Sequence, residues 1–573
     1  MGLFEKARAT QFARVLSSLN PISMRKASRT AYANCRKTQK TVLLEMVDAY
    51  RNTEFGREHD FASIKSIEDF RARVPLSSYD DYAPAIERLK AGEQDILFAG
   101  PTEYFYKSSG TTGPSKYIPE GSREALNRKV IQTLRILDWI FALGGTGVSL
   151  ALDMALTIAA TKLPFVSDKP RGKAIPFINR SIADTTEAGI PCGSASGRTA
   201  GNTVSPLMLT LYAAPAILAD EYEGDDYKYM VMRSALTCKG LRAVIGNNAL
   251  MFVDLIEYAQ EHAEELIYDI RYGGVRHLEV SDEVREQLGV KLYPQTKRAD
   301  ELEALYKAGT FTPKYYWPKL CTASFWLGGS VGAFVDRLRP LVSDTIKFMD
   351  AGYGASEAKI NMPIECDTPA GALATFTNFF EFMPAGGGEL LLADELHDGE
   401  DYELIVTNNA GFYRYELHDL IHVDGFVGDT PQIYFLTKAS DMANMAQEKA
   451  PGSLLLEGMV EALQEKGLEL ACGQVWPDAD ELHYILCMEL AGERGDSQAT
   501  DEEIATRADE LFRKKIHSYN TWRKTVIHPP VIQWMRKGWR DHLLEKAAAG
   551  QASTAQVKLP VVAKQPPEDG WRA

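Results

Sequence analysis

The sequence predicts an α/β protein of several folding units, the last of which is a small α+β unit. Its 573 residues exceed what one hydrophobic core supports and correspond to three or four units of about 150 residues each. Segments with the apolar spacing of helices alternate with short apolar segments typical of strands. The content of 45% hydrophobic and 25% charged residues is ordinary for a globular protein and argues against disorder.

The first half of the chain contains the helical and strand patterns that predict a large domain. Residues 38–52 and 80–92 space apolar residues at three and four, which predicts two helices. A strand ending near Tyr106 leads into a loop rich in Ser, Gly and Thr, and a helix is expected over about 120–141. The apolar stretch 139–160 is interrupted by three glycines and Asp153, so we expect buried core and no membrane span.

The second half predicts one long helix, several strands and a separate C-terminal unit. We expect a single amphipathic helix over 248–270 and strands within 345–353 and 401–415. Beyond residue 436 the order is helix, strand, strand, a helix opened by a Thr500 to Glu503 capping box, and a short strand. The expected division is a basic segment 1–37, a large domain 38–435, and a small domain 436–573 that ends in a lysine-bearing tail.

Charge and cysteine content exclude some classes of function. The formal charge of −15 argues against a general nucleic-acid binder. Seven cysteines without a Cys-x-x-Cys pair suit a reducing compartment, so we expect a cytoplasmic protein with neither a disulfide framework nor a zinc knuckle. The first forty residues carry nine Lys or Arg against the single acid Glu5. This segment suits an organelle presequence, a membrane-surface helix, or a solvated helix packed on the domain.

Residues 106–119, YKSSGTTGPSKYIP, have the composition of a loop that holds an anion. Small residues after a strand let backbone N–H groups converge on one point, while hydroxyls and a lysine add donors and charge. The spacing does not fit the Walker phosphate-binding loop, because Ser115 stands five residues after Gly110. Taken alone, the stretch also suits a flexible surface turn. The residues expected to hold phosphate are Ser108, Ser109, Gly110, Thr111, Thr112, Gly113 and Lys116.

Two further motifs occur in register with this loop. YGASE stands at 353–357 and YRYELHD at 413–419. Together the three motifs resemble those of adenylate-forming enzymes and, more closely, of the plant auxin-responsive acyl acid amido synthetases, the Gretchen Hagen three family. The likeness extends from about residue 38 to Lys558. It implies a large N-terminal domain of several subdomains, with mixed sheets flanked by helices as in firefly luciferase, and a small mobile α+β C-terminal domain.

The resemblance also implies a reaction and roles for individual residues. Family members use Mg²⁺ and ATP to convert a carboxylic acid to an acyl adenylate, releasing pyrophosphate, and then transfer the acyl group to an amine, usually of an amino acid. Glu357 would bind Mg²⁺, and Lys116 and Lys558 would act with it in catalysis. The implied nucleotide contacts are Ser356 for phosphate, Gly329, Ser330, Tyr353 and Gly354 along the nucleotide, and Asp419 for the ribose.

Two assignments concern substrate binding and domain motion. Leu250, Met251 and Phe252 are expected to meet an apolar acid, although a buried helix face has the same composition. Asp441 occupies a position like the hinge of the superfamily. The implied partners are a carboxylic acid and an amine or amino acid, with no nucleic acid and no transmembrane segment, in a monomer or weak homo-oligomer.

Three residues depart from the family pattern and leave other functions open. His418 stands where the family usually has a glycine, Glu416 replaces a basic residue, and Lys438 stands where the superfamily often has an arginine. His418 is either a surface histidine or crowds the ribose. The alternatives to an amido synthetase are an acyl-CoA or carrier-protein thioester ligase, and a nucleotide- or ligand-binding homologue that has lost turnover.

Overall fold

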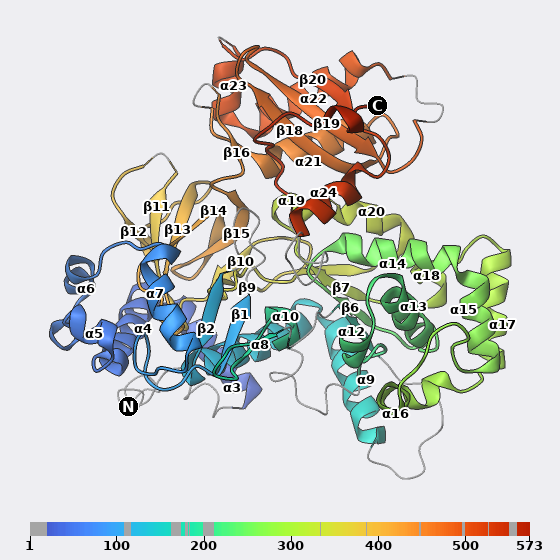
Figure 1. Cartoon of the computed structure of the whole chain (residues 1–573), viewed down its shortest axis with the longest axis horizontal. Coiled ribbons are helices and arrows are strands. Elements are labelled where there is room, and N and C mark those ends of the chain that lie inside the picture. Colours follow the sequence, from blue (N-terminus) through green and yellow to red (C-terminus); the bar gives the residue numbers. More distant parts are fainter. Residues whose placement is uncertain are drawn as a thin grey trace.

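The computed structural model describes residues 20–107, 116–161, 173–177, 182, 184–198, 211–332, 334–385, 387–445, 448–494, 499–524, 526–548 and 559–573. In these ranges the chain forms three lobes, each around its own cluster of buried apolar side chains. Figure 1 shows the first lobe at the lower left, the second at the lower right and the C-terminal lobe above both.

The first lobe contains two sheets, to which distant parts of the sequence contribute. The antiparallel sheet has the order β12-β11-β13-β14-β15-β10-β9, and a smaller sheet has the order β2-β1-β5-β4. The strands are β1 (Tyr104–Lys107), β2 (Tyr117–Glu120), β4 (Asp184–Thr185), β5 (Pro191–Gly193), β9 (Asn361–Pro363), β10 (Gly371–Leu373), β11 (Phe379–Pro384), β12 (Leu391–Leu392), β13 (Asp401–Thr407), β14 (Tyr415–Val427) and β15 (Thr430–Lys438).

Helices from the start of the chain pack on these sheets. α4 follows the expected pattern, with Val42, Leu43, Met46 and Val47 all buried on one face. α7 begins at the N-cap Ser78, whose side chain and that of Asp81 form a capping box. The helices of this lobe are α3 (Pro21–Tyr32), α4 (Cys35–Tyr50), α5 (Glu54–Glu58), α6 (Ile67–Arg73), α7 (Tyr79–Lys90), α8 (Ser122–Ala142) and α10 (Ala195–Arg198).

The second lobe is built around a parallel sheet of order β3-β6-β7-β8. Its strands are short and buried, as expected where helices cover a parallel sheet. The strands are β3 (Ala174–Pro176), β6 (Ala243–Ile245), β7 (Thr322–Phe325) and β8 (Lys347–Asp350). The helices are α9 (Gly145–Thr161), α12 (Ile217–Glu221), α13 (Gly224–Ala235), α14 (Ala249–Glu261), α15 (Ala263–Tyr272), α16 (Asp282–Leu288), α17 (Thr296–Lys307), α18 (Pro313–Tyr316), α19 (Gly329–Gly332) and α20 (Val335–Leu338).

The C-terminal lobe has the predicted α+β order. β18 pairs antiparallel with β19, which pairs in parallel with β20, and the Thr500 to Glu503 capping box opens α22. The strand β15 continues across the expected domain boundary at residues 435 and 436. The elements are β16 (Met442–Ala443), β17 (Ala450–Pro451), α21 (Gly452–Gln464), β18 (Leu470–Asp478), β19 (His483–Leu490), α22 (Asp501–Lys515), α23 (His517–Arg523), β20 (Val531–Trp534) and α24 (Trp539–Ala548).

Two expectations about helices are wrong. The single helix expected over 248–270 is two helices, because the chain leaves helical geometry at His262, with φ −102° and ψ 21°. The apolar stretch 139–160 is not buried core: it forms the end of α8 and most of α9, and it exposes Phe141, Val148, Leu152 and Leu156. Among the described residues, no helix combines the length and the apolar character needed to cross a membrane.

Candidate active site

The predicted nucleotide-site residues that the structure describes lie where the parallel sheet of the second lobe meets the antiparallel sheet of the first. β7 leads into Gly328 and Gly329, and β8 leads into Tyr353. The carboxyl ends of parallel strands share one edge of a sheet, where α/β proteins commonly bind ligands. The residue Asp419 is supplied by β14 of the other sheet. The site is therefore assembled between two sheets.

A tight hairpin after β8 presents Ser356 and Glu357. Gly354 pairs with Lys359 across the hairpin, and the Ala355 N–H donates to the Ala358 carbonyl at 2.9 Å. Neighbouring elements hold the backbone of the tip. Arg128 Nη2 donates to the Ser356 carbonyl at 2.7 Å, and Asn408 Nδ2 donates to the Glu357 carbonyl at 2.9 Å. These bonds leave both tip side chains free to meet a ligand.

Asp419 is fixed by two neighbours. The Tyr353 hydroxyl donates to Asp419 Oδ2 at 2.6 Å, and Lys438, opposite on β15, contacts Asp419 Oδ1 through its ammonium group. Burial raises the pKa of Tyr353, and the negative charge of Asp419 raises it further. Burial lowers the pKa of Lys438, but the Asp419 carboxylate more than reverses this effect, so the pKa lies above its ordinary value. Asp419 is thus an oriented carboxylate that is only 2% exposed.

The Glu357 carboxylate is buried, with no direct partner among the described residues. The residue is 8% exposed, and within the described ranges nothing donates a hydrogen bond to the carboxylate or forms an ion pair with it. Burial raises the pKa of Tyr79 and Tyr415, and the charge of Glu357 contributes to both shifts. A buried carboxylate is costly unless a cation or a hydrogen-bond donor approaches it closely.

This arrangement fits a magnesium ion that brings most of its ligands with it. No group of three His, Cys, Asp or Glu side chains suited to a metal occurs in the part of the chain that the structure describes. Mg²⁺ prefers oxygen ligands and commonly binds through one or two carboxylates together with waters and substrate phosphates. A single buried carboxylate near Lys116, the described residue of the predicted phosphate loop, meets that requirement.

Lys116 is the described part of the predicted phosphate loop. Its Nζ donates to the Tyr415 hydroxyl at 3.3 Å and lies 5.1 Å from the centre of the Tyr79 ring. The negative charge of Glu357 raises the pKa of both Tyr79 and Tyr415, so Lys116 and the Glu357 carboxylate lie near the same two aromatic residues. The remaining loop residues, Ser108, Ser109, Gly110, Thr111, Thr112 and Gly113, and the tail residue Lys558 lie outside the described residues. Their roles stay predictions.

The turn after β7 approaches β15 closely. Gly329 has φ +65°, and a Cβ there would lie 2.9 Å from Phe435 Cδ1. A Cβ at Gly328 would lie 3.2 Å from the Phe435 carbonyl oxygen. A side chain at Gly329 would therefore be both crowded and strained, whereas one at Gly328 would be in tight contact with β15. The backbone of Ser330 lies in α19, while its side chain lies outside the description.

The structure explains why His418 is unusual. This residue has φ +53°, in the left-handed region that favours glycine. Its side chain is 59% exposed, and Nδ1 lies 4.0 Å from Glu403 Oε2 on the surface of the sheet. The histidine therefore costs backbone strain, and its side chain projects toward solvent rather than toward Asp419.

Asp441 connects the end of β15 with the C-terminal tail. Its Oδ1 accepts a hydrogen bond from the Val562 N–H at 2.7 Å, and its carbonyl accepts one from the Gly452 N–H at 3.0 Å. Burial raises the pKa of the Asp441 carboxyl. Val562 stands four positions after Lys558. The predicted hinge residue thus holds the backbone next to the predicted catalytic lysine.

The acyl-pocket candidates lie at the start of α14. Phe252 is fully buried and stacks on Trp317 and Phe325, with centroid distances of 6.2 and 6.3 Å. Leu250 is 7% exposed, and Met251 is partly buried at the edge of the same core. Their contact with an acid stays a prediction.

Sequence reasoning missed the residues that support the hairpin. Arg128 and Asn408 hold its backbone, and Arg128 also pairs with Glu124 at 2.8 Å. The four-residue spacing of Glu124 and Arg128 on α8 was a readable signal for their pairing. Nothing local in the sequence indicates that Arg128 reaches Ser356, because 228 positions separate them.

Comparisons with known proteins decide the family. The GH3 family N-terminal domain matches residues 25–346, the central domain 371–438 and the C-terminal domain 455–567. The chain belongs to the GH3 family. GH3 stands for Gretchen Hagen three, so the family expected from the motifs is confirmed.

Named GH3 relatives match along nearly their whole length. The jasmonoyl-L-amino acid synthetase JAR6 of Nicotiana attenuata is 24% identical over 563 residues, covering 91% of this chain and 90% of that protein. A 4-substituted benzoates-glutamate ligase of Arabidopsis thaliana is 24% identical over 570 residues, covering 92% and 93%. The solved GH3.15 acyl acid amido synthetase has a TM-score of 0.76 at 19% identity, covering 94% and 92%. The predicted α/β fold with a separate C-terminal unit is confirmed, while the mobility of that unit stays a prediction.

Proposed function

We propose that this GH3 protein is an ATP-dependent acyl acid amido synthetase. It activates a carboxylic acid as an acyl adenylate with release of pyrophosphate and then transfers the acyl group to the amine of an amino acid or another amine. The observation that carries the proposal is the buried Glu357 carboxylate near Lys116 and Asp419, which has no hydrogen-bond or ion-pair partner within the described ranges, in a chain that matches the family along nearly its full length. The named relatives include amino acid synthetases and a glutamate ligase.

In this mechanism Asp419 accepts the ribose hydroxyls of ATP, and the Tyr353 hydroxyl keeps the carboxylate oriented. Lys116 and the preceding loop hold the phosphates and the departing pyrophosphate. Glu357 would hold Mg²⁺, which supplies charge neutralisation between the phosphates and the incoming carboxylate. The carboxylate oxygen of the acid attacks the α-phosphorus, the bond to the pyrophosphate oxygen breaks, and the amine later displaces AMP from the acyl carbon.

The domain division supports this two-step scheme. We place the large domain at 38–435 and the small domain at 436–573, with the pivot at Asp441. The contact between Asp441 and Val562 links the pivot to the backbone that carries Lys558. Lys558 would stabilise charge on the α-phosphate during activation and leave when the small domain rotates. All seven cysteines are free thiols, which suits the cytoplasmic location that we propose.

ATP–pyrophosphate exchange tests the proposal. Purified protein is assayed with Mg²⁺ across aromatic, indolic, jasmonate-like and fatty acids. Exchange that depends on one acid supports adenylation, and discharge of that adenylate by an amine rather than by a thiol supports the amido synthetase. Discharge by coenzyme A alone would favour a thioester ligase. ATP binding without exchange for any acid would favour a homologue that has lost turnover, in which Lys438 competes with the ribose for Asp419.

A further inference from the structure

Two cationic side chains lie together beside the hairpin that carries Glu357. Arg135 belongs to α8, and Lys359 pairs with Gly354 across the hairpin. Both residues are partly buried, and among the described residues nothing accepts a hydrogen bond from either side chain or forms an ion pair with it. Burial lowers the pKa of Lys359, and the positive charges of Arg128 and Arg135 lower it further. The two cations are therefore held close to each other, with no direct partner in the described ranges.

Backbone contacts fix the position of Arg135. A Cβ at Gly352 would lie 3.1 Å from Arg135 Cζ and 3.2 Å from its Nε, so the guanidinium packs directly on this glycine. The nearby carboxylate of Asp350 accepts hydrogen bonds from the N–H groups of Gly352 at 2.6 Å and Leu327 at 2.7 Å. Burial lowers the pKa of Arg135, and the charge of Asp350 only partly offsets this effect, without an ion pair. The acid closest in charge to Arg135 is thus engaged by the backbone instead.

Arg128, seven positions earlier on the same helix, shows how this chain stabilises a buried arginine. Its Nε donates to Glu124 at 2.8 Å, and its Nη2 donates to the Ser356 carbonyl at 2.7 Å. Two like charges in a partly buried place are unfavourable until an anion comes between them. The guanidinium of Arg135 is also a planar fork that matches a carboxylate. Arg135 and Lys359 therefore have the chemistry of a site that binds a carboxylate.

This pair is distinct from the groups that we assign to the phosphates. The charge of Glu357 acts on Tyr79 and Tyr415, which also contact Lys116. The charges that act on Lys359 come from α8 instead. The side chains of Glu357 and Lys359 thus have different surroundings, although only two positions separate them. An anion on the α8 side of the hairpin lies next to the reaction without taking the place of ATP.

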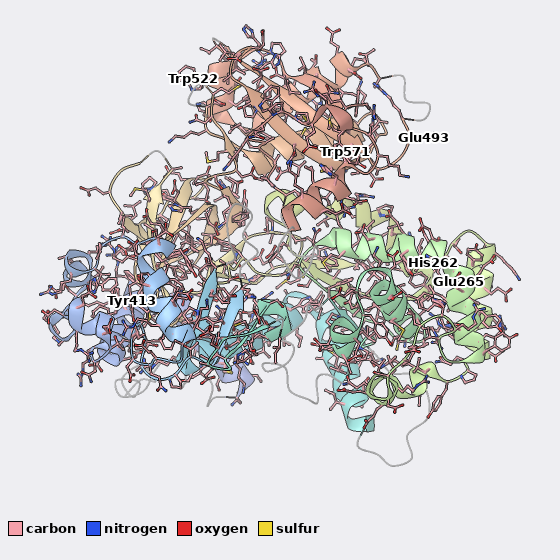
Figure 2. All side chains as sticks on the ribbon, in the orientation of Figure 1. His262, Glu265, Tyr413, Glu493, Trp522 and Trp571 are labelled. Carbon is pink, nitrogen blue, oxygen red and sulfur yellow. The ribbon has the colours of Figure 1, made fainter. Side chains whose placement is uncertain are left out.

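Trp326 connects this place with the start of α14, where we expect the apolar part of an acid. Its backbone N–H donates to the Asn247 carbonyl at 3.0 Å, and its Nε1 donates to the Gly352 carbonyl at 3.1 Å. Figure 1 shows α8 passing from the first lobe toward the parallel sheet of the second, and Figure 2 shows side chains of both lobes gathered along it. A substrate that reaches from α14 to Arg135 would therefore end at the two cations.

We propose that Arg135 and Lys359 bind a carboxylate of the substrate other than the one that is activated. This group belongs either to a dicarboxylic acid or to the amino acid that accepts the acyl group, and both sources present the same chemistry to the site. The inference rests on the proposed function, because it names a substrate group held beside that active site. It predicts that the protein selects dicarboxylic acids over monocarboxylic acids, or amino acids over simple amines.

Calorimetric titration of the full-length protein tests the inference without turnover. The probes are matched pairs with and without the extra carboxylate: terephthalate and benzoate, adipate and hexanoate, and phenylalanine and phenethylamine. We expect the carboxylate-bearing member of at least one pair to bind about tenfold more tightly. Arg135→Gln should remove most of this preference. Lys129→Met is the matched control, because Lys129 is an exposed cation of the same helix and should leave the preference unchanged.

Lys359→Met keeps the test decisive if Arg135→Gln folds poorly, and it should weaken the same preference. A preference confined to the diacids assigns the site to the acid, whereas one confined to phenylalanine assigns it to the acceptor. No preference in any pair, or a preference unchanged in both variants, would overturn the inference.

ATP–pyrophosphate exchange separates this outcome from the proposed function. Exchange that treats mono- and dicarboxylic acids alike, without a preference for phenylalanine in the titrations, would overturn the inference and leave the activity standing. A carboxylate preference that both variants lose, without exchange for any acid, would support the site and count against the activity.

Kinetics distinguish binding from a structural role. In Arg135→Gln the KM for the preferred carboxylate substrate should rise about tenfold with little change in kcat, and the KM for its partner without the carboxylate should stay the same. Equal changes for both members of the pair would show a structural role and refute the assignment.

Discussion

Replacing Glu357 with glutamine isolates the charge that we assign to magnesium. The side chains of Arg128 and Asn408 hold the hairpin by donating to the backbone carbonyls of Ser356 and Glu357, respectively. An isosteric side chain at position 357 therefore leaves these bonds intact. The carboxylate has no partner among the described residues, so the substitution breaks no ion pair there. Removing a buried charge that has no direct partner within the described ranges should leave the unliganded protein as stable as before or more stable.

The magnitude follows from what the ligand loses. An interaction with a charged group is worth about 1.5 to 3 kcal/mol, which corresponds to about 10- to 150-fold in an equilibrium or rate constant. Because Mg²⁺ is divalent and the site is buried, we expect the upper half of this range, about 30- to 150-fold, in the Mg²⁺ concentration for half-maximal exchange. Saturating Mg²⁺ should recover part of the rate.

The assay is ATP–pyrophosphate exchange titrated with Mg²⁺, together with the thermal shift that ATP produces with and without the ion. The control is Glu365→Gln, an exposed acid eight positions along the chain. The variant should lose the Mg²⁺-dependent part of the ATP-induced shift, whereas the control should retain it. An unchanged Mg²⁺ titration in Glu357→Gln would refute the assignment of this carboxylate to the metal.

Three further predictions concern the surroundings of the site. Tyr353→Phe should raise the KM for ATP about tenfold with little change in kcat. The reason is that the hydroxyl that orients Asp419 contributes to ATP binding equally in the ground state and the transition state. An unchanged KM would contradict this role. His418→Gly should raise the free energy of unfolding in urea by about 0.5 to 1 kcal/mol, by relieving the positive φ, without lowering the exchange rate. Burial lowers the pKa of Lys359 from 10.5 to about 7. Between these pH values the unfolded chain binds one more proton than the folded chain. The free energy of unfolding therefore rises with pH, by at most about 1.4 kcal/mol per pH unit. Urea titrations from pH 7 to 9 should show this rise in the parent protein and a flatter profile in Lys359→Met; parallel profiles would show that the lysine stays charged when buried.

Much of the fold was predictable because its signals are local. The apolar spacing in α4 and α7 and the capping box of α22 each involve residues within one or two turns of a helix. The long helix expected over 248–270 failed at His262, since its apolar pattern continues across the break and histidine is not a strong helix terminator. The burial expected for 139–160 failed because composition does not say which face of α9 meets the lobe.

The candidate site was likewise predictable only in part from the sequence. Family motifs singled out Tyr353, Glu357 and Asp419, and the structure brings all three together. Their supports, Arg128 and Asn408, come from elements far away in the sequence, where no short pattern connects them to the hairpin. The ion pair of Lys438 with Asp419 depends on the register of β14 against β15, which the bulges in that pairing shift.

The bond between Asp441 and the Val562 N–H sets a limit on how far the tail can reach. Lys558 stands four residues before this anchor, so its Cα lies within about 14 Å of that of Val562 in any conformation of the intervening chain. If the small domain rotates about Asp441, Val562 stays close to the rotation axis. Lys558 would then move by no more than its short connection to Val562 allows, a smaller distance than residues at the far side of the lobe would move. Pro560 and Val561 are hydrogen-bonded to β18, so a few glycines inserted directly after Lys558 would lengthen the connection and loosen the lysine without disturbing these contacts.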